Sequence, residues 1–387
     1  MNIPIYQTLA GQRYLDGSIT KADVRWRIAA TMESEVRSYA QTLLESGFVL
    51  HQLRVIDSEY PDKKNLFYCF YKGDTCVYVF FDAAKHTVFI TAEPKGDLPP
   101  VDKLAAGELT PTLTQMPVAG MGYVIRLADG AFICIDGGLN RLDAVQELYE
   151  FLKANTLDEK PRIALWLFTH AHEDHIQLAA AFLREYRERV QVDAFAYQFS
   201  DLTKNAPTMN DFDLAEIEAF ERSVALYPNA KRYVLHTGQK YYFSGVEMEV
   251  LYSLDNVYPM PYTSLNSISA AVRFQFDCGK TALFLGDCMC LECRDMAYMY
   301  GEYLKSDILQ VTHHGLIGGD RLLYEKIDAD ICLWPVNEQR FSGTDTKQKY
   351  QWCLGEGGCD YNAYLRDERI KKRTHYHAGK IITIEIR

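Results

Sequence analysis

The spacing of apolar residues changes twice along the first hundred positions. Between residues 20 and 46, apolar side chains recur mostly every three or four positions, which predicts a helix that ends at Gly47. Short runs rich in aromatic and β-branched residues follow at 48–55, 65–71, 75–81 and 86–92, and they predict strands. We therefore expect a small α+β domain over residues 1–95, followed by a Pro- and Gly-containing linker at 96–111.

A second unit is predicted over residues 112–387. Its early part reads strand, turn, strand, helix, strand and helix. The corresponding segments are 123–127, 128–130, 131–135, 141–154, 163–168 and 177–190. Strand-like runs return at 232–235, 246–252, 269–276, 281–285 and 308–311. This alternation predicts an α/β (α+β) domain in which helices cover sheets.

Composition narrows the choice of partners. The net charge of −11 argues against a broad basic surface for duplex nucleic acid, but it leaves a phosphate-bearing small molecule or nucleotide open as substrate. The chain has neither a signal-like start nor an apolar run of about 18 residues, so we expect no membrane association. The 10 cysteines are scattered, which favours reduced thiols and a cytoplasmic protein.

The segment directly after the apolar run 163–168 carries the strongest chemical signal. It reads His170-Ala171-His172-Glu173-Asp174-His175, with three imidazoles and two carboxylates in six residues. These are the side chains that zinc, manganese and iron accept as ligands. In an extended loop, residues two apart point the same way, so His170 and His172 can share one metal ion. Asp174 and His175 then turn toward a second metal position.

This His-x-His-x-Asp-His pattern after an apolar strand resembles the metallo-β-lactamase superfamily. The resemblance implies an αββα sandwich, with two divalent ions, zinc or manganese, at the sheet edge. Two later segments match it, 282–287 and 309–315. By resemblance, Asp287 is the bridging carboxylate, a histidine of the pair His313 and His314 completes the second metal, and Asp136 steadies the metal loop. We favour His313 as the ligand because it ends its strand, which leaves His314 to contact substrate or a neighbouring ligand.

One position departs from the superfamily pattern. Where most members carry a third histidine for the first metal, this chain has Asn266. That variant resembles the metallo-hydrolase domain of the competence-type DNA-uptake family, which shares the Asn-Ser run, the His-His-Gly and a C-terminal segment like 374–386. An amide oxygen is a weaker ligand, so the first site is expected to bind loosely or to take magnesium or manganese. His236 is an alternative ligand, and His375 and His377 are expected to contact substrate.

These residues together predict a metal-dependent hydrolase that acts through a metal-bound hydroxide. Asp174 and Asp287 would orient the hydroxide, and His314, His375 or His377 would protonate the leaving group. Phosphodiester hydrolysis, nuclease-like or on a nucleotide, is the leading reaction. The alternatives are hydrolysis of an ester, thioester, lactone or β-lactam on the same residues, and a binding module with a relict metal site. The N-terminal domain has no assigned role beyond substrate recognition or formation of a homodimer.

Overall fold

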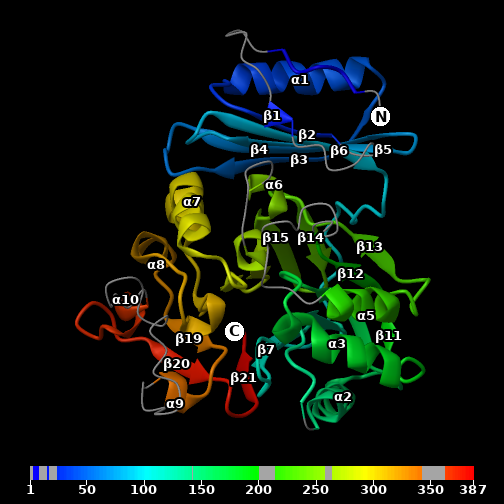
Figure 1. The fold of residues 1–387 in the computed structure, drawn as a ribbon, viewed down its shortest axis with the longest axis vertical. Helices are drawn as coiled ribbons and strands as arrows, with labels where there is room; N and C mark the ends of the chain where they lie inside the picture. Colours follow the sequence, from blue (N-terminus) through cyan, green and yellow to red (C-terminus); the bar gives the residue numbers. More distant parts are fainter. Residues whose placement is uncertain are drawn as a thin grey trace.

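The computed structural model describes residues 3–7, 15–16, 24–141, 143–199, 214–257, 264–341 and 362–387. Their strands form three sheets (Figure 1). The first sheet is antiparallel, with the order β1-β2-β6-β5-β4-β3. Its strands are β1 (Leu15–Asp16), β2 (Val24–Ile28), β3 (Val49–Asp57), β4 (Lys64–Lys72), β5 (Thr75–Asp82) and β6 (Thr87–Pro94).

Helix α1 (Glu33–Glu45) covers one face of this sheet through Val36, Tyr39 and Leu43. The predicted helix over 20–46 is therefore wrong in its first half, because Val24–Ile28 form β2 and pair with β6. Apolar residues at 24, 26 and 28 also fit the two-residue period of a strand, and pairing with β6 decides between the two periods. The helix begins only where the Glu35 carboxylate accepts a hydrogen bond of 2.6 Å from the Met32 N–H.

The other two sheets pack face to face. The eight-stranded sheet contains β7 (Thr112–Gln115), β8 (Tyr123–Arg126), β9 (Phe132–Ile135), β10 (Arg162–Leu167), β11 (Gln191–Val192), β12 (Ala194–Ala196), β13 (Lys231–Tyr233) and β21 (Ile382–Glu385). The seven-stranded sheet contains β14 (Lys240–Phe243), β15 (Val246–Tyr252), β16 (Ala271–Phe276), β17 (Thr281–Phe284), β18 (Ile308–Gln310), β19 (Ile331–Trp334) and β20 (Thr374–His377). Apolar side chains from both sheets, among them Ile133, Leu165 and Phe284, share one core.

Helices cover both outer faces of this pair of sheets. On the eight-stranded sheet lie α2 (Ala144–Asn155), α3 (Glu173–Glu185) and α5 (Leu214–Val224). On the seven-stranded sheet lie α7 (Cys290–Tyr300), α8 (Arg321–Ile327) and α10 (Ala363–Arg366). The result is an αββα sandwich, the arrangement that the resemblance of the motifs implied. Shorter elements are α6 (Leu254–Val257), α9 (Glu338–Phe341), η1 (Leu265–Ile268), η2 (Gly301–Leu304) and η3 (His313–Gly315).

The six-stranded sheet lies against the sandwich with the face that α1 leaves uncovered (Figure 1). Phe67, Tyr78 and Phe89 of this face share an apolar cluster with Met296 and Tyr300 of α7. This shared cluster joins the N-terminal sheet to the sandwich by a continuous core.

Among the described residues, no helix has the length and apolar character to span a membrane.

His236, which follows β13, lies at this junction and is fully buried. Its Nδ1 is 2.8 Å from Asp255 Oδ2, its Nε2 is 3.2 Å from Glu93 Oε1, and its ring stacks on Tyr78. The alternative role of His236 as a metal ligand stays a prediction, and in this structure both of its ring nitrogens face carboxylates. Sequence spacing could not show this, since Glu93 comes from the N-terminal sheet.

The charge on His236 should make the stability of the protein depend on pH. Burial lowers the pKa of His236, but the attraction of Asp255 and Glu93 outweighs burial and raises the pKa to about 9. The folded pKa exceeds the ordinary 6.5, so this contribution is complete below pH 6.5 and is lost as the pH rises through 9. At most about 3 kcal/mol of unfolding free energy is involved.

We expect H236Q to remove this part of the pH dependence. Chemical denaturation of both proteins between pH 6 and about 9.5 measures it, because the difference between the two proteins isolates one group. Curves of unfolding free energy that stay parallel across this range would show that His236 is neutral in the folded protein.

Candidate metal centre

The predicted metal ligands follow strands that end at one edge of the sandwich. β9 and β10 are parallel neighbours in one sheet, and β17 and β18 are parallel neighbours in the other. Asp136 follows β9, the His170–His175 loop follows β10, Asp287 follows β17, and the histidine pair follows β18. Because parallel strands present their carboxyl ends at the same edge, residues from four separate segments converge there.

Asp287 is the centre of this convergence. Four imidazole nitrogens surround its Oδ2: His314 Nε2 at 3.2 Å, His175 Nε2 at 3.4 Å, His313 Nε2 at 3.9 Å and His170 Nε2 at 4.0 Å. Among the residues that the structure describes, two groups of side chains have the spacing to hold a metal ion. One is His170, His172 and Asp287, and the other is Asp174, His175 and His314. In the second group, His314 Nε2 is 3.1 Å from Asp174 Oδ2.

The other ring nitrogens of these histidines are held by acceptors. His313 Nδ1 donates to the Ile317 carbonyl at 2.7 Å, and His314 Nδ1 donates to the Pro335 carbonyl at 3.3 Å. A carbonyl only accepts, so Nδ1 carries a proton in both rings and Nε2 faces Asp287. Metal-binding histidines are commonly oriented by a partner of this kind. Neither carbonyl is visible in a residue pattern.

Asp136 orients the ring of His175 directly and the ring of His170 through Thr169. Its carboxylate accepts from the Thr169 N–H and the Thr169 hydroxyl, both at 2.8 Å, and lies 2.7 Å from His175 Nδ1. Since the Thr169 hydroxyl donates to Asp136, its oxygen is left to accept from His170 Nδ1 at 3.1 Å. His170 and His175 therefore also turn Nε2 inward. These are the hydrogen bonds expected of Asp136, and Thr169 is a member of the network that the sequence did not single out.

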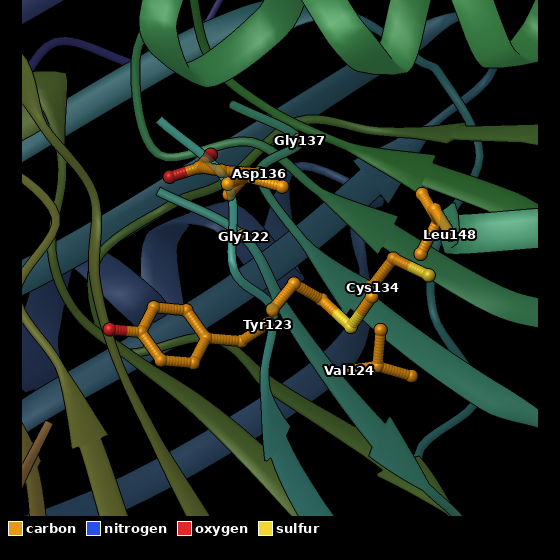
Figure 2. Close-up of a pocket in the computed structure, with 9 residues that line it drawn as sticks. Gly122, Tyr123, Val124, Cys134, Asp136, Gly137 and Leu148 are labelled. Atoms are coloured by element: carbon orange, nitrogen blue, oxygen red, sulfur yellow. The ribbon is translucent and has the colours of Figure 1, made fainter. Parts of the chain in front are cut away.

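Figure 2 shows Asp136 and Gly137 among the residues that line a small cavity. Its lining includes Val124, Cys134 and Leu148, whose side chains are apolar and belong to the core. The cavity is a small gap in packing, and the Asp136 carboxylate beside it is already engaged by Thr169 and His175. The chemistry therefore belongs to the opposite side of Asp136, where His170 and His175 meet Asp287.

Buried charges in the cluster set the protonation of its members. Burial raises the pKa of Asp287, but His314, His175 and His313 outweigh it and hold that pKa well below its ordinary value. Burial lowers the pKa of His314, yet Asp287 and Asp174 raise it to about 10. Burial, together with His175 and His172, holds the pKa of His170 well below its ordinary value. A metal ion must displace protons from part of this cluster, so metal affinity should rise with pH.

Two buried oxygens in the cluster test whether a metal fits. Within the described residues, Asp287 Oδ1 and Asn266 Oδ1 have no hydrogen-bond donor. A buried oxygen without a partner costs roughly 1–3 kcal/mol, and more when it is charged. A divalent cation would satisfy both oxygens, and imidazole, carboxylate and amide oxygen are all ligands of zinc or manganese. The residues present therefore fit a metal centre.

The positions of His313 and His314 differ from expectation. We expected His313 as the ligand of the second site, but His314 is the residue beside Asp174, and His313 Nε2 lies 3.3 Å from Asn266 Nδ2. Both histidines have positive φ, 47° and 56°. The chain therefore leaves the strand geometry at residue 313, and the alternation of a strand no longer tells which imidazole faces the site.

His375 and His377 stand outside the two ligand groups, on β20. His375 Nδ1 accepts a hydrogen bond of 3.0 Å from Trp334 Nε1, and the His377 ring packs on Phe341. Their contact with substrate stays a prediction. Gln310 was missed altogether: it is buried at the end of β18, accepts from the Leu285 and Gly286 N–H groups, and so fixes the turn before Asp287. A buried amide in an apolar strand was its only signal.

Comparison with known proteins gives the following. No family model and no curated protein matches the chain. Among solved structures, the diiron β-hydroxylase CmlA of Streptomyces venezuelae is similar with 12% identity over 93% of this chain and 79% of that one, TM-score 0.45. A CmlA variant has 14% identity over 72% of this chain, TM-score 0.45, and the match spans about half (54%) of the variant's length.

Two further structures extend the comparison. Unliganded yeast PDE1 is similar with 10% identity over 72% of this chain and 100% of that one, TM-score 0.41. A variant of a metallo-β-lactamase from Cronobacter sakazakii is similar with 12% identity over 49% of this chain and 65% of that one, TM-score 0.30. Likenesses this distant do not assign an activity, which has to be argued from the residues.

Removal of the Asp136 carboxylate should weaken metal binding. D136N keeps the size of the side chain but cannot hold both Thr169 and the His175 N–H as before. We expect metal affinity to fall about 10- to 100-fold, as for other residues that orient a ligand. Titration against a chromophoric chelator measures it. The control is D129N, in an exposed turn where Asp129 pairs with Arg162. Equal affinities in D136N and D129N would remove the role given to Asp136.

Proposed function

We propose that this protein is a two-metal hydrolase that acts on phosphodiesters. One observation carries the proposal: Asp287 Oδ2 lies within 4.0 Å of four imidazole Nε2 atoms, while its second oxygen is buried without a donor. Asp287 belongs to the first ligand group, and its Oδ2 lies within 3.4 Å of the Nε2 atoms of His175 and His314 in the second. A carboxylate in that position would help to hold two cations, as in two-metal hydrolases.

The two ions would have different ligand sets. His170, His172 and Asp287 would hold the first, and Asp174, His175, His314 and Asp287 would hold the second. His313 Nε2 lies 3.9 Å from Asp287 Oδ2 and 3.3 Å from the Asn266 amide nitrogen, so these two residues would complete the first set. An amide oxygen is neutral and hard, which favours manganese or magnesium there, while the imidazole-rich second set favours zinc.

A pair of divalent ions at this edge would supply a nucleophile from water near neutral pH and would offset negative charge on the substrate. Asp174 is the carboxylate placed to accept a proton, because its side chain is 30% exposed whereas that of Asp287 is 2% exposed. Burial lowers the pKa of His375 and of His377 below the ordinary value, so both are neutral at pH 7. A neutral imidazole is a poor source of a proton for a leaving group, and His375, whose Nδ1 accepts from Trp334, would donate a hydrogen bond to substrate through Nε2.

The preference for phosphodiesters over carbonyl compounds rests on charge and on the variant at Asn266. Five imidazoles and two cations gathered around three carboxylates give a site suited to an anionic substrate, although the whole chain has a net charge of −11. The Asn-Ser run with His-His-Gly also resembles the metallo-hydrolase domain of the competence-type DNA-uptake family, which acts in DNA internalisation.

The proposal predicts hydrolysis of bis-p-nitrophenyl phosphate, and of linear or cyclic nucleotides, in zinc, manganese or magnesium. A chelator should abolish it, and H172A should reduce it at least about 1,000-fold, because a ligand of the first ion is lost. H51A is the control, since His51 lies on β3, outside the metal centre, with its Nε2 2.9 Å from the Pro99 carbonyl. H172A with undiminished activity would show that the site lies elsewhere.

Two other outcomes would replace the proposal. Turnover of esters, thioesters, lactones or β-lactams without turnover of phosphodiesters would assign the same residues to carbonyl chemistry. Elemental analysis that finds no metal in freshly purified protein, and no metal uptake on titration, would identify a relict site.

A further inference from the structure

The short helix α6 lies between the six-stranded sheet and the metal centre. It contacts β6 on one side and η1 on the other. η1 carries Asn266, whose amide nitrogen is 3.3 Å from His313 Nε2. Leu254 of α6 shares an apolar cluster with Leu265 and Ile268 of η1. A shift of α6 would therefore move the segment that completes the first metal site.

One buried carboxylate fixes α6 from the side of the six-stranded sheet. Asp255 accepts hydrogen bonds from four side chains that come from four different segments. They are His236 Nδ1 at 2.8 Å, Arg25 Nη1 at 2.9 Å, Gln198 Nε2 at 3.1 Å and Thr91 Oγ1 at 3.3 Å. Arg25 lies on β2 and Thr91 on β6, so half of the donors belong to the N-terminal sheet.

The charges of this junction are balanced within it. Arg25 and protonated His236 face Asp255 and Glu93, with Arg25 Nη2 3.8 Å from Glu93 Oε2. All four side chains are at most 13% exposed. Removing one member leaves an uncompensated charge in a buried place, which the structure can relieve only by moving α6 or by admitting water.

We propose that Arg25 is a positioning residue for the first metal: through Asp255 it holds α6 and η1, and thereby Asn266 and His313, where that ion binds. This rests on the proposed two-metal function. The second ion depends on other contacts, because His175 is held by Asp136 and His314 by the Pro335 carbonyl. The N-terminal sheet is then a part of the metal centre, although it contributes no ligand to it.

A second ion pair across the same junction provides a matched control. Arg54 of β3 lies 2.7 Å from Glu249 of β15, and this pair is as buried as the pair of Arg25 and Asp255. Glu249 belongs to the middle of a strand and is braced by Arg273 and Tyr303, not by α6. R25M and R54M therefore remove equivalent ion pairs between the sheet and the sandwich, and only the first pair touches α6.

The experiment is titration of the full chain with Co²⁺, whose absorption spectrum reports each ion as it binds. Wild-type protein should take up two ions. In R25M, the affinity for one Co²⁺ ion should fall about 10-fold or more, while the affinity for the other should stay within about twofold of the wild-type value. R25K, which keeps a positive charge, should recover part of the loss. R54M should lower the melting temperature but leave both affinities unchanged. T91V removes a neutral donor to Asp255, so it should show a smaller loss at the same site even if R25M does not fold.

Three results would decide against the inference or its premise. If R25M and T91V both bind two Co²⁺ ions with the affinities of the wild type, the junction does not position the first site. An equal loss in R54M would show general loosening of the sandwich. Wild-type protein that binds fewer than two ions would instead overturn the two-metal function itself, so the two failures are distinguishable.

Discussion

A buried carboxylate surrounded by imidazoles is the constraint on which this structure depends. Asp287 is 2% exposed, and burial of an ionised group is costly unless opposite charge compensates it. The compensation comes from His175, which follows β10, and from His314, which follows β18. These two strands belong to different sheets. The sandwich must therefore align two strand ends from each sheet at one edge, and Asp136, Thr169 and Gln310 act as the braces of that alignment.

The sequence predicted most of what depends on order and period. The His170–His175 motif and the strand before Asp287 could be inferred because each is a local pattern, and the αββα arrangement followed from the resemblance that these motifs carry. The strands of the N-terminal sheet from β3 to β6 were also predicted, since turn residues separate clear runs of aromatic and β-branched side chains.

The features that the sequence did not predict depend on partners that are remote along the chain. Val24–Ile28 form a strand because they pair with β6. Glu93 and Asp255 are the partners of the two His236 ring nitrogens. Which of His313 and His314 lies beside Asp174 depends on the positive φ angles of both residues, and a histidine in the sequence does not predict a positive φ. In each case a tertiary contact or a left-handed residue overrides a pattern that was locally valid.

The consecutive left-handed residues His313 and His314 also bear on how this protein could be improved by engineering. A histidine at positive φ costs roughly 1 kcal/mol or more, and glycine carries no such cost. Glycine at these positions would relieve that strain but would remove imidazoles that compensate the buried Asp287 carboxylate, and breaking a buried ion pair costs about 3–5 kcal/mol. The bend after β18 therefore keeps two strained histidines, because the loss of the charge that they place beside Asp287 would cost more than the strained backbone.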